Sequence, residues 1–233
     1  MFILDQSKFN DYNLSNAKQF VEFWSAYYVE DTTKVFNSNE VISYIEELNL
    51  QNNLTEANVK RLLRWKDPRM LTEEILAGPN KGKENNRVMR VIAKIEDINK
   101  FRRDEIPENS FKEVVNSIFP GGIIWQIFLF HIARPFEYPI ADRYVFLAFS
   151  TQRQKEIPKD WEGYRDYKDY FFEVALSGRI IDRKPDGNEH DIKEIVSKLK
   201  KVDNALFAFG AFVNYYGASV KDLPLTPAQI LGF

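Results

Sequence analysis

Apolar residues recur along most of the chain at intervals of three and four, the period of an amphipathic helix. Strict alternation of apolar and polar residues, which is typical of a half-buried strand, is scarce, and no two alternating runs are joined by a hairpin turn. The pattern therefore predicts an all-α protein. The expected helices cover, to within a few residues, 14–29, 38–49, 55–66, 84–103, 110–118, 122–133, 142–151, 161–178, 189–201 and 203–216.

Local signals mark several helix ends. Asn37 and Ser38 precede Glu40 in an arrangement similar to a capping box. Thr55 is placed to cap the helix that follows it, and that helix should end before Pro68, because the residue before a proline avoids the α region. These signals predict where two of the helices begin.

Composition narrows the classes of function. The 233 residues are 44% hydrophobic and 15% aromatic, which is ample for a buried core, and the formal net charge is −2. Without cysteine there is no disulfide, thiolate zinc site or cysteine-ligated iron–sulfur cluster, so a reducing cytoplasm is the expected compartment. The apolar run Ile123–Ile132 is too short to span a bilayer, and no membrane contact, metal or cofactor is expected. A slightly acidic protein needs a local basic face to bind nucleic acid.

The stretch 119–149 combines a glycine turn, a very apolar helix and a single acid. Glycine at Pro120-Gly121-Gly122 permits a positive φ or the close approach of another backbone. The helix that follows begins with exposed N–H groups, which attract an anion such as a phosphate. Asp142 then opens the next helix. On local grounds it is either a structural N-cap or a carboxylate that is fixed by the cap and directed into a site.

This arrangement resembles the helix-hairpin-helix DNA glycosylase superfamily. Members carry an L-P-G-x-G hairpin, an apolar helix, a loop with proline, and a catalytic Asp that opens the next helix as V-D-x-H-V. The matching residues are Phe119-Pro120-Gly121-Gly122-Ile123, the apolar helix 124–133, and Ala141-Asp142-Arg143-Tyr144-Val145. The chain departs from the pattern at the last hairpin glycine, replaced by Ile123 or shifted to Gly122, and at Tyr144, which replaces the family's His.

The resemblance implies an all-α, two-lobed fold of the helix-hairpin-helix DNA glycosylase type in one compact unit, residues 1–233. An inner lobe of about 31–141 would contain the hairpin 119–123. The second lobe would combine the N-terminal helix with about 142–233. A monomer is expected to bind double-stranded DNA with one base flipped out of the helix.

The resemblance also implies a reaction. Asp142 would activate water and stabilise the oxocarbenium-like transition state of N-glycosidic cleavage. Trp125 or Gln126 stands where bifunctional members hold a Schiff-base lysine, so the implied enzyme is a monofunctional glycosylase that leaves an abasic site. Its substrate would be a damaged or modified base, and modified bases of foreign DNA, such as a phage's, are one setting.

Further residues complete the expected site. The flipped base would lie against Trp125, Gln126, Tyr144 and His131, although His131 has a second interpretation as a hydrogen-bonded core residue. Arg87, Arg90 and Lys94 are spaced to share a helix face, and Lys100, Arg102 and Arg103 follow them. The expected DNA contacts are Pro120, Gly121, Gly122, Ile123, Lys66, Arg134, Arg143, Arg87 and Arg90.

Two other interpretations stay open at this point. A non-catalytic helical module for DNA or protein binding would keep the hairpin and use Asp142 only as a cap. A different all-α protein would carry the same helix pattern without either function. An open groove around Asp142, lined by Trp125, Tyr144 and basic residues, would favour an enzyme, and a sealed carboxylate would favour the alternatives.

Overall fold

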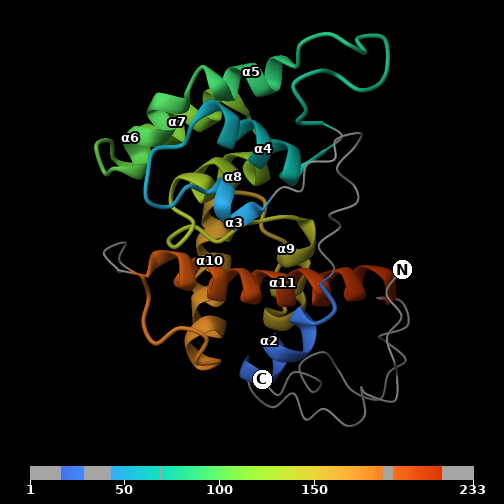
Figure 1. The fold of residues 1–233 in the computed structure, drawn as a ribbon. Coiled ribbons are helices and arrows are strands. Elements are labelled where there is room, and N and C mark those ends of the chain that lie inside the picture. The colour runs from blue at the N-terminus through green and yellow to red at the C-terminus, as the bar shows by residue number, and fades with distance from the viewer. Residues whose placement is uncertain (1–16, 29–42, 69, 186–190, 217–233) are drawn as a thin grey trace. The chain divides into compact units, whose positions relative to one another are not determined.

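The computed structural model describes residues 17–28, 43–68, 70–185 and 191–216. These residues are all-α apart from an isolated antiparallel bridge between Glu74 and Glu84 (Figure 1). The chain divides into two compact units. Among the described residues, unit 1 holds 17–28, 139–185 and 191–216, and unit 2 holds 43–68 and 70–138. None of the described helices combines the length and the apolar content that crossing a membrane requires.

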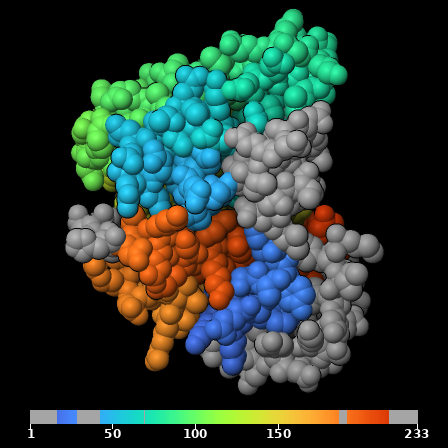
Figure 2. All heavy atoms as spheres, in the orientation of Figure 1, coloured from blue at the N-terminus to red at the C-terminus, as the bar shows by residue number. Residues whose placement is uncertain are grey.

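Unit 1 is built around one long helix. Among its described residues the helices are α2 (Ala17–Ser25), α9 (Arg143–Arg153), α10 (Trp161–Ser177) and α11 (Ile192–Tyr216). Helix α11 packs against the other three, and Figure 2 shows α2 in blue beside the orange and red of α11.

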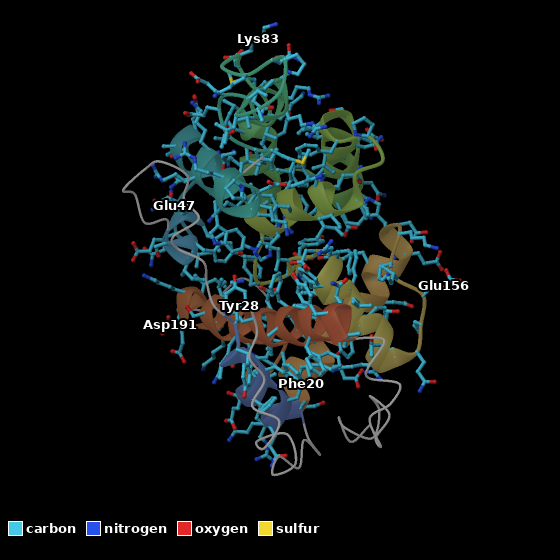
Figure 3. All side chains as sticks on the ribbon, turned by 90° about the vertical axis from the view of Figure 1, so that its right-hand side faces the viewer. Phe20, Tyr28, Glu47, Lys83, Glu156 and Asp191 are labelled. Atoms are coloured by element: carbon cyan, nitrogen blue, oxygen red, sulfur yellow. The ribbon has the colours of Figure 1, made fainter. Side chains whose placement is uncertain are left out.

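Aromatic rings fill the contact between α2 and α11. The ring centroid of the buried Trp24 lies 5.2 Å from that of Phe209 and 5.3 Å from that of Phe212. The side chains labelled in Figure 3 include Phe20 of α2 and Tyr28, the last described residue of the same segment. Phe20 contacts Phe209 at 5.7 Å between centroids, so the first described helix is held to the last by burial of large apolar surface.

The described part of unit 2 holds six short helices. They are α3 (Tyr44–Glu47), α4 (Glu56–Lys66), α5 (Asn86–Ile92), α6 (Ile95–Arg102), α7 (Glu108–Ile118) and α8 (Ile123–Ala133). The rings of Phe101, Phe111 and Phe130 meet in the core, with centroids 4.3 Å apart for the first pair and 4.7 Å for Phe111 and Phe130. Helix α8 is apolar nearly all round and is buried from Gln126 to Ala133, as its composition predicts. Lys83 lies in the connection before α5, at one end of unit 2 (Figure 3).

Several predicted helix ends are confirmed. Thr55 caps α4, because its hydroxyl accepts the N–H of Asn58 at 3.2 Å, and the Asn58 side chain accepts the Thr55 N–H in return. The helix ends at Lys66, two residues before Pro68. The arrangement predicted at Asn37 and Ser38 lies outside the described residues.

Two helix predictions are wrong. The helix expected over 84–103 is two helices, α5 and α6, separated at Ala93 and Lys94 without glycine or proline at the break. The amide of Asn99 fixes α6 by bonding both the N–H and the carbonyl of Leu54, at 2.8 and 3.0 Å. Such a contact, 45 residues away in sequence, leaves no periodic signal. The helices expected over 189–201 and 203–216 are the single helix α11, because nothing at Val202 interrupts the backbone.

Candidate functional site

The Pro-Gly-Gly segment forms a tight turn between α7 and α8. The Phe119 carbonyl accepts the N–H of Gly122 at 3.1 Å, with Pro120 and Gly121 at the two central positions. Gly121 has φ +71°, which is the conformation that the third residue of a type II turn needs and that only glycine adopts without strain. Gly122 then stands at the N-cap of α8. The turn exposes Pro120 and Gly121 and leaves Ile123 half-buried.

Gln126 holds this turn from inside. Its side chain is 5% exposed, and its amide nitrogen donates to the carbonyl of Phe119 at 2.8 Å and to Asn116 at 3.1 Å. The neighbouring Trp125 is half-buried, with its ring centroid 6.0 Å from that of Phe119. Of the two side chains that stand in place of the family's lysine, Gln126 is therefore engaged in shaping the hairpin and Trp125 is partly accessible.

His131 links three segments of unit 2. Its Nδ1 lies 2.6 Å from the carbonyl oxygen of Tyr138, which can only accept, so Nδ1 carries the proton. Nε2 then accepts the hydroxyl of Tyr44, whose ring also packs on Trp65 at 4.2 Å between centroids. The histidine is buried with both nitrogens engaged, which favours its interpretation as a core residue over a base contact.

Asp142 caps α9. Its Oδ1 accepts the N–H groups of Tyr144 at 2.7 Å and of Val145 at 3.0 Å, and the side chain is half-buried. Two N–H donors fix the orientation of a carboxylate and favour its ionised form. Asp160 caps α10 with almost the same backbone, φ −146° and ψ −176° against −151° and −178° for Asp142, but it is exposed.

The extended segment before Asp142 is held by its own carbonyl groups. The carbonyl of Tyr138 bonds to His131, as described above. In unit 1 the next two carbonyls accept hydroxyl donors from α10: Pro139 from Tyr164 at 2.9 Å, and Ile140 from Tyr167 at 3.1 Å. All these donors are buried. The carbonyl groups of Tyr138, Pro139 and Ile140 thus each have a hydrogen-bond partner, and the backbone that leads to Asp142 is held by them.

Side chains on the first turn of α9 form an aromatic and cationic group. The guanidinium carbon of Arg143 lies 4.4 Å from the centre of the Tyr144 ring, and Arg143 also donates to the Tyr144 hydroxyl. The Tyr144 ring also meets Phe207 of α11, at 5.0 Å between centroids, and Phe207 meets Tyr28 at 5.5 Å. Tyr144, Phe207 and Tyr28 are each half-buried.

Backbone contact at Gly210 sets the distance between α9 and α11. A Cβ at Gly210 would lie 1.9 Å from the carbonyl oxygen of Tyr144, and real Cβ atoms do not approach another atom so closely. Only glycine therefore permits this crossing, two residues from Asp142. Sequence reasoning missed Gly210, as it missed Tyr164 and Tyr167, because the contacts join segments that are far apart in the chain.

The expected DNA-binding cations divide into two groups. Arg134 is engaged inside unit 2: it donates to the Phe101 carbonyl at 2.8 Å and pairs with Asp104 and Glu137. Lys66 is half-buried, with Nζ 5.8 Å from the centre of the Phe128 ring. Arg87 and Arg90 of α5 are exposed, as Arg143 is in unit 1.

The prediction that Arg87, Arg90 and Lys94 share one helix face is wrong, because α5 ends at Ile92. Lys94 lies in the break after α5 and pairs with Asp97 at 3.4 Å. Arg102 turns inward and donates to the carbonyls of Leu48 and Asn49, both at 2.7 Å, and Arg103 pairs with acids on its own side of the unit. Of the predicted cluster, Arg87 and Arg90 are exposed, Lys100 is half-buried, and the exposed Arg103 is engaged in ion pairs.

Within the described residues, no three His, Asp or Glu side chains are arranged as metal ligands. Comparison of the chain with protein-family models, with curated proteins and with solved structures found no match.

Proposed function

We propose that this protein is a monofunctional DNA glycosylase, which hydrolyses the bond between a damaged or modified base and its deoxyribose. The observation that carries the proposal is the carboxylate of Asp142, oriented by two N–H donors at the start of α9 and preceded by a segment whose carbonyls are individually held. Cleavage of an N-glycosidic bond places positive charge on the sugar. A fixed, ionised carboxylate stabilises that charge without reorganising during the reaction.

Accessible aromatic and cationic groups beside Asp142 suit a base and a phosphate. An extruded base is held by stacking on aromatic faces. In unit 1 the half-buried Phe207 is the ring proposed to stack on it, because Arg143 lies over the Tyr144 ring. Arg143, exposed next to Asp142, supplies a positive charge for the DNA backbone. In unit 2, the type II turn presents the N-terminus of α8, where Ile123 and Ile124 carry N–H groups suited to a phosphate.

The absence of an amine in the first turn of α8 determines the product. Residues 123–126 read Ile-Ile-Trp-Gln, so no lysine is available there to form a Schiff base with the sugar. Water is then the nucleophile, and the strand stays intact at the abasic site until alkali cleaves it. The substrate class is a modified base, with modified phage DNA as one source.

The test compares the wild type with two matched variants. Asp142→Asn and Asp160→Asn each replace an N-cap carboxylate by an amide that caps equally well, so both should fold with similar stability. Each protein is incubated with duplexes carrying deaminated, oxidised, alkylated or no modified bases, and with phage DNA. Strand breaks are then scored before and after alkali.

The proposal expects alkali-dependent breaks from the wild type and from Asp160→Asn, and a loss of at least about a hundredfold in Asp142→Asn, the scale of one electrostatic catalytic group. Breaks without alkali would contradict the monofunctional assignment. Equal DNA binding by all three proteins without any abasic sites would refute catalysis and favour the non-catalytic binding module.

A further inference from the structure

A second acid of unit 1 is buried on α11. Asp203 is 5% exposed, and one of its oxygens pairs with Lys200 at 2.5 Å. Its other oxygen, Oδ1, is buried and has no hydrogen-bond partner among the described residues. An unsatisfied carboxylate oxygen in a protein interior is costly. Where one occurs, a bound water or a functional role is the usual reason.

The register of α11 places Asp203 near the segment that carries Asp142. Residues 203, 207 and 210 lie on one face of the helix, since they are separated by four and by seven positions. Phe207 on this face contacts the Tyr144 ring, and Gly210 contacts the Tyr144 carbonyl. The face therefore packs on the start of α9, with Asp203 one turn of helix before Phe207.

Electrostatic effects on Tyr167 agree with this placement. Burial, and next the charge of Asp203, raise the pKa of the Tyr167 hydroxyl well above its ordinary value, and Asp142 adds to the effect. Both carboxylates therefore act on the same hydroxyl. That hydroxyl is donated to the Ile140 carbonyl, and Lys200 bonds the other oxygen of Asp203. Neither group provides a donor for Asp203 Oδ1, whereas a water molecule with two protons can bridge two acceptors.

We propose that Asp203 and Asp142 share one water molecule and that this water is the nucleophile of the reaction, an inference that rests on the proposed glycosylase function. The water oxygen forms a bond to C1′ of the deoxyribose as the bond from C1′ to the base nitrogen breaks. The electron pair of that bond leaves with the base, which takes up a proton from solvent. Asp203 accepts the proton that the water loses, and Asp142 stabilises the positive charge on the sugar.

The first experiment needs no enzymatic activity. The side-chain carboxyl carbons of aspartate are labelled with ¹³C, and the titration of Asp142 is followed by NMR in the wild type and in Asp203→Asn. A neighbouring negative charge disfavours ionisation of a carboxyl group, so removing the charge of Asp203 should lower the Asp142 midpoint by about one pH unit. Other charged or titratable groups of unit 1 in the surroundings of the pair stay unchanged, namely Arg143, Tyr144, Tyr164, Tyr167, Tyr170 and Lys200. Asp160→Asn is the control and should leave the midpoint where it is.

The second experiment measures single-turnover cleavage. Asp203→Asn should lower the rate of the chemical step by about a hundredfold or more, leave substrate binding within threefold, and remove the acid limb of the pH–rate profile. Asp203→Glu, which keeps a carboxylate, should recover part of the rate. A residue that only stabilised α11 would not change the pH profile.

Each outcome bears on a separate claim. An unchanged Asp142 midpoint, or cleavage by Asp203→Asn within threefold of the wild type, overturns the shared water. A shifted midpoint in a protein that makes no abasic sites supports the shared water and refutes the glycosylase reaction. If Asp203→Asn fails to fold because Lys200 is left without its counter-charge, the variant Lys200→Met/Asp203→Asn removes both charges and is measured in the same way.

Discussion

Replacing Gly210 by alanine tests the contact that sets α9 against α11. In a helix interior this replacement normally stabilises a protein by about 1 kcal/mol, because alanine is the better helix former. Here the added methyl would lie 1.9 Å from the oxygen, 2.6 Å from the carbonyl carbon and 3.1 Å from the Cα of Tyr144. All three atoms belong to the backbone of a packed helix, so no side-chain rotation relieves the overlap. The helices would have to separate by well over an ångström.

We therefore expect Gly210→Ala to destabilise the protein, although the same replacement in an ordinary helix interior stabilises it. Overpacking of a close interior contact costs about 1–3 kcal/mol or more, which outweighs the gain in helix propensity. In urea unfolding followed by far-ultraviolet circular dichroism, Gly210→Ala should have a lower midpoint concentration than the wild type. The dependence of its unfolding free energy on urea concentration should be similar. Asn214→Ala, at an exposed position of α11, is the control and should change stability by less than about 0.5 kcal/mol. Equal or greater stability of Gly210→Ala would refute the close crossing.

Two further predictions concern the tyrosines of α10 and their surroundings. Tyr167→Phe should lower the free energy of urea unfolding by about 1–3 kcal/mol, because the Ile140 carbonyl is left buried without a donor. Tyr164→Phe should have a similar effect through the Pro139 carbonyl. Losses below about 0.5 kcal/mol would show that water replaces the hydroxyl. Burial raises the pKa of Tyr167, Tyr170 and Tyr138 above the ordinary value of 10.0, so their stabilising contribution is complete below that pH and is lost as pH rises beyond it. Unfolding should therefore accompany tyrosinate absorbance at 295 nm above pH 10, and ionisation that starts well before unfolding would contradict the burial.

The helical class and most helix ends were predictable because they depend on local chemistry. The Thr55 cap, the Asp142 cap and the Pro120-Gly121 turn each involve residues within three positions of one another, and such features leave a signature in the sequence. The bonds between Asn99 of α6 and Leu54, and the contact of Gly210 with Tyr144, join residues that are tens of positions apart. The spacing of hydrophobic residues carries no information about such partners, so these features could not be predicted from the sequence.

The same distinction separates what was foreseen at the site from what was not. Asp142 was predicted from its position after a proline loop, and its own cap contacts lie in the first turn of α9, but the contacts that fix the residues on either side of it come from α10 and α11. Tyr164 and Tyr167 donate hydrogen bonds to the carbonyls of Pro139 and Ile140, which precede it. Gly210 lets α11 pack closely on the backbone of the helical turn that follows it. A structural N-cap needs only an N–H donor from the first turn of its own helix, as the exposed Asp160 demonstrates with the N–H of Gly163. The buried hydrogen bonds from Tyr164 and Tyr167 restrict the backbone that leads to Asp142, which a cap alone does not need. The proposed stabilisation of a transition state by this carboxylate requires such a fixed position.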